Sequence, residues 1–268
     1  MKILFLGDIV GKGTCKFVKK NLPKIIKKKK IDFVIANGEN AAADGNGITK
    51  KIAIELLKSG IDVITSGNHI WDKNDICKYL EVQKRILRPI NFYKNSPGKG
   101  FSIFQTKNKY KIGVLNLMGN IFMEKCDNVF LSAKEFLNNY KLRKDYHFLV
   151  VDFHTETIVE KMALGHMFDG SATLVVGTHT HVPTKDERIL EKGTAYVSDA
   201  GMCGDYNSVM GFNKKIFLEK LLKGKVKKNF PVKKNISLSG IIVHSNPKNG
   251  LANKVESLIY GGNLKNYY

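Results

Sequence analysis

The sequence lacks any long apolar run, and this absence excludes an integral membrane protein. A membrane-spanning helix needs about 18 or more consecutive apolar residues, and no stretch of that length occurs. The apolar run at residues 3–6 is also too short for the central segment of a signal peptide. We therefore expect a cytoplasmic protein that has no membrane partner.

Cysteine is scarce as well, and the spacing of the few cysteines excludes common metal and redox motifs. Cys15, Cys77, Cys126 and Cys203 form no CxxC pair, so neither a zinc ribbon nor a thioredoxin motif is present. A secreted protein of this size would more often pair its cysteines in disulfides. The pattern favours reduced thiols in a cytoplasmic protein.

Acidic residues are few relative to basic ones, which makes the chain strongly basic. The 44 lysines and arginines outnumber the 24 aspartates and glutamates, and the resulting formal net charge of +20 attracts phosphate-rich partners such as RNA. Aromatic residues are not interleaved with the lysines, however, as they would be in a platform for stacked bases. RNA binding and a merely solvated, lysine-rich surface both stay open, and so does assembly into a homo-oligomer.

The sequence does contain a repeated pattern of short apolar strands and helical segments. Hydrophobic residues make up 43% of the chain, which is enough for a buried core. Apolar runs rich in β-branched residues alternate with segments of helical spacing, which predicts an α/β sandwich with central mixed sheets flanked by helices, in one domain over residues 1–268. The predicted strands cover residues 2–6, 32–36, 62–65, 111–117, 147–152, 173–176, 195–197 and 241–244, and the predicted helices cover 14–28, 49–59 and 132–142.

Polar residues cluster directly after five of these strands. Because ligands of an open α/β sheet bind outside the carboxyl ends of its strands, we expect the clusters to lie together at one sheet edge. They supply two carboxylates, two carboxamides and four histidines, which are Asp8, Glu39, Asn40, Asn68, His69, His154, His179 and His181.

This mixture of side chains indicates a metal site. Imidazole, carboxylate and amide groups together suit ions such as iron, manganese, zinc, cobalt or nickel. Seven of the eight residues, all except His69, are potential ligands. Seven are too many for one ion but suit two ions that share a bridging carboxylate. Such a pair of ions can clamp a phosphate and generate a hydroxide nucleophile. A single aspartate at a strand end more often caps a helix or a turn. The prediction of a metal site therefore depends on all the polar clusters taken together.

The same residues resemble the motifs of a known superfamily. Gly7-Asp8, the GNH tripeptide at 67–69 followed by Asp72, and GTHTH at 177–181 resemble the calcineurin-like metallophosphoesterases. In particular, the chain resembles the YmdB-like branch, a group of small bacterial phosphodiesterases. The matching segments are GDIVG at 7–11, NGEN at 37–40, SGNHIWD at 66–72, DFHTET at 152–157, VVGTHTHVPTKD at 175–186 and GTAYVSDAGMCG at 193–204. The resemblance implies a metallophosphoesterase-like fold.

The resemblance also implies a role for each residue of the site. One ion would be held by Asp8, Glu39, Asn40 and His181. Glu39 would bridge to a second ion, which would also be held by Asn68, His154 and His179.

His69 is implied to protonate the leaving oxygen, and both His69 and Asn40 to contact the substrate. A histidine near its ordinary pKa can hold a proton at neutral pH and deliver it as the bond breaks. Asp72 either orients His69 or caps the following helix. Thr155 and Glu156 either orient His154 or cap a turn.

The sequence departs from the broad superfamily at two motifs. The first motif is usually D-x-H, but Asp8 is followed by Ile9 and Val10, and the second motif has Glu39 where a bridging aspartate is usual. Both departures agree with the YmdB-like branch, which implies iron or another transition metal.

The implied reaction is the hydrolysis of a phosphodiester, with 2′,3′-cyclic nucleotides favoured as substrates. A metal-bound hydroxide would attack phosphorus while the ions and Asn40 stabilise the developing charge and His69 protonates the leaving group. Two alternatives stay open. One is a regulatory or RNA-associated binding protein whose metal site is structural or slow, and the other is a phosphomonoesterase of the same superfamily.

Overall fold

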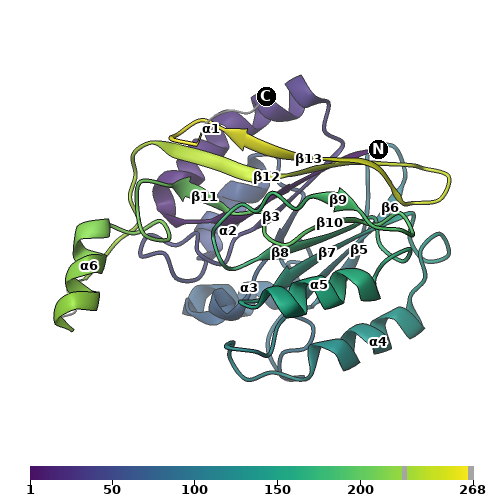
Figure 1. Ribbon diagram of the computed structural model, residues 1–268, viewed down its shortest axis with the longest axis horizontal. Helices are drawn as coiled ribbons and strands as arrows, with labels where there is room; N and C mark the ends of the chain where they lie inside the picture. Colours follow the sequence, from purple (N-terminus) through teal and green to yellow (C-terminus); the bar gives the residue numbers. More distant parts are fainter. Residues whose placement is uncertain (225–227, 265–268) are drawn as a thin grey trace.

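Two β-sheets packed face to face form the centre of the protein, with helices on both outer sides (Figure 1). The structure is a computed structural model and describes residues 1–224 and 228–264. Within these residues the first sheet has the strand order β2-β11-β12-β1-β3-β4, with β13 beside β12, and the second has the order β5-β6-β7-β8-β10-β9. The first sheet is formed by β1 (Lys2–Leu6), β2 (Asp8–Ile9), β3 (Phe33–Asn37), β4 (Val63–Thr65), β11 (Met202–Asp205), β12 (Ile236–Ser245) and β13 (Ala252–Tyr260). The second is formed by β5 (Phe101–Gln105), β6 (Lys111–Met118), β7 (Phe148–His154), β8 (Leu174–Thr178), β9 (Arg188–Ile189) and β10 (Ala195–Val197).

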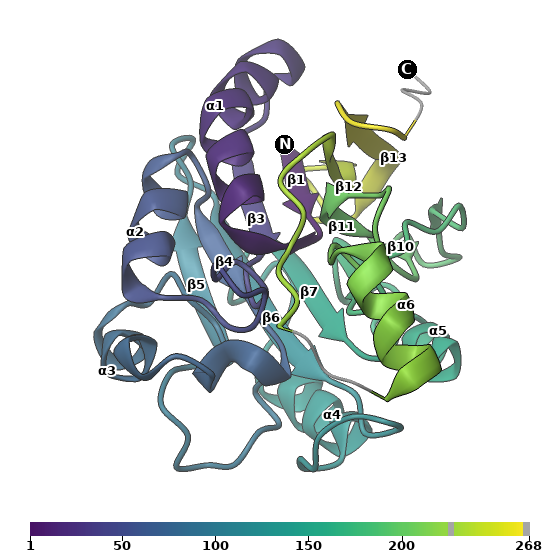
Figure 2. The ribbon, with the colours of Figure 1, turned by 90° about the vertical axis from the view of Figure 1, so that its left-hand side faces the viewer.

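Helices cover the outer face of each sheet. Figure 2 shows α1 (Gly11–Lys29) and α2 (Lys50–Lys58) outside the first sheet, followed by α3 (Asn74–Val82). The second sheet is covered by α4 (Val129–Asn139) and α5 (Ile158–Met167). A sixth helix, α6 (Lys214–Lys223), has no buried residue and projects from the body of the protein (Figure 1). The predicted α/β sandwich of mixed sheets flanked by helices is confirmed.

Alternating side chains along the strands build three apolar layers. On β1, Leu4 and Leu6 pack against the helices of the first sheet, whereas Ile3 and Phe5 pack against the second sheet. On β7, Val150 faces the first sheet while its neighbours on the strand pack against α4 and α5. Burial on both faces explains why these strands are continuous apolar runs in the sequence.

Parallel pairing brings the carboxyl ends of the central strands together. In the first sheet β1, β3 and β4 run parallel to one another. In the second sheet β6, β7 and β8 do the same, and the register places His154 of β7 beside Thr178 of β8. The polar segments that follow these strands therefore emerge on one side of the sandwich.

The predicted elements agree with the observed ones to within a few residues, but several elements were not predicted. The helix predicted at 132–142 begins earlier, at Val129, because the Asn128 side chain accepts hydrogen bonds from the backbone N–H groups of Phe130 and Leu131. Helix α5 was missed because its first residues break the apolar periodicity, with Val159 exposed. That residues 1–268 form one domain stays a prediction.

No helix in the described ranges combines the length and the apolar character that crossing a bilayer requires.

Candidate active site

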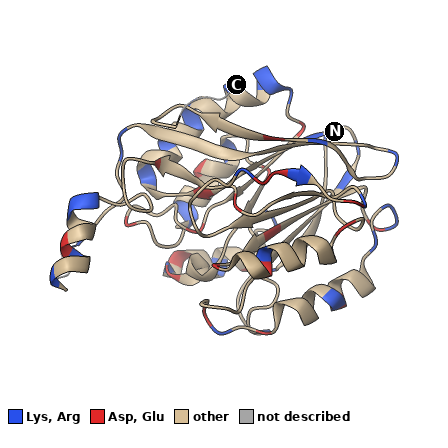
Figure 3. Cartoon of the chain, in the orientation of Figure 1, with Lys and Arg blue, Asp and Glu red and all other residues tan. Residues whose placement is uncertain are grey.

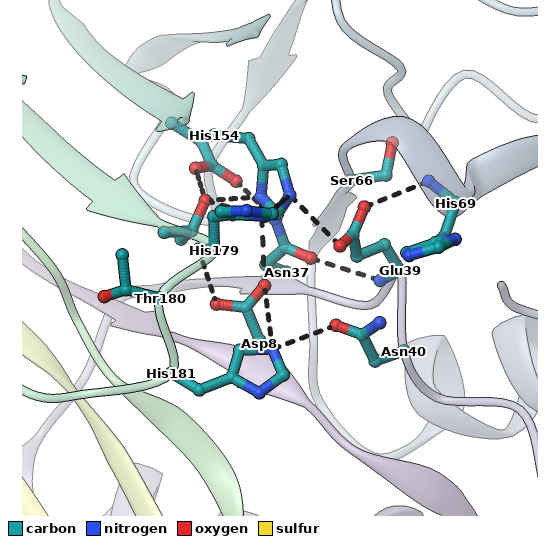
Figure 4. A network of polar contacts seen from close by, with 12 residues as sticks. Asp8, Asn37, Glu39, Asn40, Ser66, His69, His154, His179, Thr180 and His181 are labelled. Atoms are coloured by element: carbon teal, nitrogen blue, oxygen red, sulfur yellow. Dashed lines mark hydrogen bonds and ion pairs between the residues drawn. The ribbon is translucent and has the colours of Figure 1, made fainter. Parts of the chain in front are cut away.

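Seven of the eight predicted site residues, all except Asn68, are drawn together in Figure 4, where the strand ends of the two sheets meet. The first sheet supplies Asp8 from β2, Glu39 and Asn40 from the turn after β3, and Asn68 and His69 from the short helix η1 (Asn68–Trp71) after β4. The second sheet supplies His154, the last residue of β7, and His179 and His181, which follow β8. The site is therefore shared between two sheets, which corrects the prediction that it lies at the edge of one sheet.

One half of the site is a group of three side chains around His154. The His154 Nε2 atom lies 3.0 Å from the Glu39 Oε1 atom and 3.0 Å from the His179 Nδ1 atom. The three residues can present one ligand atom each within 4.8 Å of one another, a separation that suits a common metal ion. On its outer side the His179 Nε2 atom lies 3.1 Å from Glu156, so the Nδ1 atom is the one turned toward the site.

The other half of the site is built around Asp8. The His181 Nε2 atom lies 3.2 Å from the Asn40 Oδ1 atom and 4.0 Å from the Asp8 Oδ1 atom. The Asp8 Oδ2 atom accepts a hydrogen bond of 3.2 Å from the backbone N–H of His179, which joins the two halves. The distances therefore sort the donors into two adjacent groups.

Two buried oxygen atoms of this site have no hydrogen-bond donor. Among the described residues, the Asp8 Oδ1 and Asn68 Oδ1 atoms are buried acceptors without a partner. The Asn68 amide group instead donates to Glu124 at 3.4 Å. Buried acceptors are normally satisfied, because leaving one unpaired costs about 1–3 kcal/mol. Carboxylate and amide oxygens among imidazoles are a donor set that a metal ion would satisfy, so the residues present fit the predicted group.

His69 stands at the border of the site and is held in place from two sides. Its Nδ1 atom lies 2.8 Å from the Asp72 Oδ2 atom, and its backbone N–H donates to Glu39 at 3.2 Å. The side chain is 34% exposed, so solvent and a ligand can reach it. Asp72 therefore orients His69, whereas Lys73 occupies the position before α3, so the interpretation of Asp72 as a helix cap is wrong.

Burial and close charges perturb the acid–base behaviour of the site. Burial raises the pKa of Asp8 well above its usual value. Burial acts on Glu39 in the same direction, but the adjacent His154 outweighs it and lowers the pKa of Glu39 to about 2. For His154 the effects are reversed. Burial lowers its pKa, but the negative charges of Glu39 and Asp8 outweigh this effect and raise the pKa of His154 to about 9. Burial, together with the charge of His154, lowers the pKa of His179 to about 3. The buried carboxylates of Glu39 and Asp8 thus favour a positive charge in the space beside them, where His154 lies.

A buried hydrogen-bonded group beneath the site holds His154 and Glu39 in place. The Thr178 hydroxyl lies 2.9 Å from the His154 Nδ1 atom and donates to Asp152 at 2.7 Å. The Asn37 side chain donates to Asp152 at 3.1 Å and accepts from the Glu39 backbone N–H at 3.1 Å. Asn37, Asp152 and Thr178 stand out in the sequence as polar residues in otherwise apolar strands, but their supporting role was not predicted. Of the two roles left open for Thr155, orienting His154 is not observed, since the Thr155 hydroxyl donates to Glu160 at 2.6 Å.

The loop that carries His179 and His181 has an unusual backbone. Both residues have positive φ, 100° and 64°, a region that residues other than glycine adopt at a cost. Between them, the Thr180 backbone N–H and hydroxyl both donate to Asp199, at 3.1 and 2.7 Å. Asp199 in turn forms a buried ion pair of 2.7 Å with Lys161 of α5. These contacts hold the strained conformation that turns both imidazoles toward the site.

Gly67 packs directly against the donors, and replacing it by alanine is predicted to damage the site. A Cβ atom at this position would lie 2.1 Å from the His154 Cδ2 atom and 2.4 Å from the Glu39 Oε2 atom, so both side chains must move. We expect turnover to fall about 100-fold, the effect of a misplacement of about 1 Å, and bound metal to fall in parallel. Steady-state kinetics and metal analysis would measure this. Gly204→Ala, whose added Cβ meets only Met202 at 3.2 Å, is the control, and equal losses in both variants would contradict the prediction.

The fold and this arrangement of donors define an α/β sandwich of the metallophosphoesterase type. The chain belongs to the family of YmdB-like proteins, whose model matches residues 4–258, so the resemblance predicted from the sequence is confirmed.

Individual relatives match over nearly the whole chain. It is 41% identical over 264 residues to a 2′,3′-cyclic-nucleotide 2′-phosphodiesterase of Bacillus subtilis strain 168, with 97% of each chain covered. The crystal structure of a novel phosphatase from Mycoplasma pneumoniae is similar, with a TM-score of 0.90 at 33% identity, over 98% of this chain and 94% of that one. A hypothetical protein from Thermus thermophilus matches with a TM-score of 0.89 at 33% identity, over 98% of this chain and 100% of that one.

Proposed function

We propose that the protein is a metal-dependent phosphodiesterase that hydrolyses 2′,3′-cyclic nucleotides at a site for two ions. The observation that carries the proposal is the convergence of seven potential ligands from two sheets, including the buried, unpartnered oxygens of Asp8 and Asn68. The substrate class is supported by the relative at 41% identity, which is named a 2′,3′-cyclic-nucleotide 2′-phosphodiesterase. The coarser statement, that the chain is a hydrolase acting on phosphoric diesters, is supported by the names of its relatives.

The ligands divide into the two groups that the distances define. By distance, Asp8, Asn40 and His181 would hold one ion, and Glu39, His154 and His179 the other. As the family resemblance implies, Asn68 would join the second group and Glu39 would serve both ions. When bound, such ions supply Lewis acidity toward the phosphoryl oxygens and a nucleophile at neutral pH. The mixed nitrogen and oxygen donors suit iron or manganese, and they also suit zinc.

The protein side chains around the ligands position the substrate and move a proton. The Nδ1 atom of His69 is engaged by Asp72, which leaves the Nε2 atom for the substrate. A proton held at Nε2 would pass to the oxygen that leaves phosphorus. The Asn40 amide donates to the Gly45 carbonyl oxygen at 3.0 Å, which fixes its orientation and directs its Oδ1 atom toward His181.

Turnover of 2′,3′-cyclic AMP by the purified protein tests the proposal. We expect activity after loading with manganese or iron, none after chelation, and recovery when metal is returned. The monoester p-nitrophenyl phosphate serves as the competing substrate, because a phosphomonoesterase would prefer it. Folded, metal-loaded protein without phosphodiesterase activity would contradict the proposal and favour a regulatory or RNA-associated role.

A further inference from the structure

Five lysines recur along α1 at intervals of four residues. These residues, the lysine row, are Lys12, Lys16, Lys20, Lys24 and Lys28. A four-residue spacing advances each side chain by about 6 Å along the axis and turns it by about 40°, so neighbouring lysines lie close together while the row as a whole winds about 160° around the helix. All five are exposed, and the sequence of α1 contains no aspartate or glutamate that could neutralise them from within the helix. Basic residues accordingly mark α1 repeatedly along its length (Figure 3).

The lysine row borders two hollows between α1 and strands β12 and β13. The first, about 500 Å³, is lined by Lys12, Lys16 and Lys20, with Lys233 among the residues from outside the helix. The second, about 590 Å³, is lined by Lys24 and Lys28, with residues 258–260 of β13 opposite. The lining of neither hollow includes an acidic side chain. The row thus lines both hollows, and we call the lysine row together with these two hollows the basic groove.

An aromatic pair lies between the two hollows. The rings of Phe17 in α1 and Tyr260 at the end of β13 have centroids 6.3 Å apart and are tilted by 52°. Both residues are partly accessible, and the Tyr260 hydroxyl donates to Asn21 at 3.4 Å. In the sequence Phe17 is the single aromatic residue among these lysines, and the fold adds Tyr260, which is distant from α1 in the sequence, beside it. The expectation that no aromatic residue is interleaved with the lysines is corrected at this place.

We propose that this groove binds a single-stranded nucleic acid. Ammonium groups repeated about every 6 Å along α1 suit the regular phosphates of a flexible single strand, and the neighbouring rings offer surfaces on which bases stack. An anionic membrane would favour lysines on a convex face, whereas here Lys233 adds charge on the far side of a hollow. The groove begins near the active site, since α1 starts three residues after Asp8. The inference does not depend on the proposed phosphodiesterase activity.

The test compares two triple variants that lose the same charge. In the first, Lys16→Gln, Lys20→Gln and Lys24→Gln remove the middle of the lysine row. Fluorescence anisotropy with a labelled single-stranded RNA of about 20 nucleotides measures the affinity, and a gel checks that the RNA stays intact. We expect the dissociation constant to rise more than tenfold. The slope of log affinity against log salt should fall by about 2, because each lost phosphate contact removes roughly 0.7.

The control triple carries Lys58→Gln, Lys78→Gln and Lys134→Gln, which are exposed lysines on α2, α3 and α4. We expect its affinity for the RNA to change less than twofold, and both triples to hydrolyse 2′,3′-cyclic AMP like the unmodified protein if the proposed function holds. Equal weakening in both triples would overturn the proposal, as would an unmodified protein that does not bind RNA. Binding to anionic vesicles that depends on the lysine row, without RNA binding, would overturn it in favour of a membrane surface.

Discussion

Replacing Asp8 by asparagine is expected to eliminate turnover while leaving the fold intact. The exchange keeps the shape of the side chain but removes the charge of a fully buried carboxylate that faces His181 and His154. Loss of a residue that only supports a ligand costs about 10–100-fold in metal affinity or activity, so loss of a proposed ligand should exceed 100-fold. Steady-state kinetics with 2′,3′-cyclic AMP and metal analysis of the purified variant would measure both effects.

Stability separates this outcome from simple misfolding. Without metal, the carboxylate of Asp8 is buried close to Glu39 and Asp152, and burial raises its pKa. A neutral asparagine side chain would avoid the cost of burying a charge, so we expect the metal-free variant to be at least as stable to denaturant as the metal-free parent. Asp169→Asn is the matched control, since Asp169 accepts hydrogen bonds from Lys192 and Thr194, away from the proposed ligands, and should keep full activity. An active Asp8→Asn protein would refute the role proposed for Asp8.

Replacing His69 by glutamine should slow catalysis according to the leaving group while metal content stays unchanged. His69 lies beside the donors but is not among the proposed ligands, and its Nδ1 atom is held by Asp72. Loss of a proton donor costs about 10²–10⁴-fold when the leaving oxygen needs the proton, as in a cyclic nucleotide. Bis-(p-nitrophenyl) phosphate releases a stable phenolate, so the loss with that substrate should be much smaller.

The ratio of the two losses is the decisive quantity. Equal losses with both substrates would show that His69 acts in binding or in organising the site, and not as the proton donor. Asp72→Asn provides an internal comparison, because it leaves the imidazole present but weakens its orientation. We expect Asp72→Asn to give a loss of the same kind, dependent on the leaving group, but about tenfold smaller than that of His69→Gln, in line with an indirect role.

Most of the sandwich, and the gathering of most candidate site residues in one place, could be predicted from the sequence, for a physical reason. Strands buried on both faces are continuous apolar runs, and the polar residues that follow them stand out, as Gly7-Asp8 does after β1. In an element whose apolar residues remain exposed, the sequence shows no such contrast between a buried apolar segment and the polar residues around it. Helix α6 illustrates this, because none of its residues is buried and Leu221 and Leu222 are largely exposed.

Polar contacts between residues far apart in the chain could not be predicted from the sequence. Asn37, Asp152 and Thr178 come from three strands, and only the face-to-face packing of the sheets brings them together beneath His154. The pairing of His69 with Asp72 was within reach at a spacing of three residues, but the same spacing also fits a helix cap. Local pattern therefore indicated which residues matter, whereas tertiary packing decided which of them touch.

The division of the donors between two sheets has a mechanical consequence. Glu39 and His154 approach each other to 3.0 Å although they belong to different sheets, and the apolar layer between the sheets sets that separation. A cation bound there would act as a cross-link between the two halves of the sandwich, in the way a disulfide joins distant segments. Sliding of one sheet over the other would pull the proposed ligands apart, so holding such a cation would require an interior that resists shear.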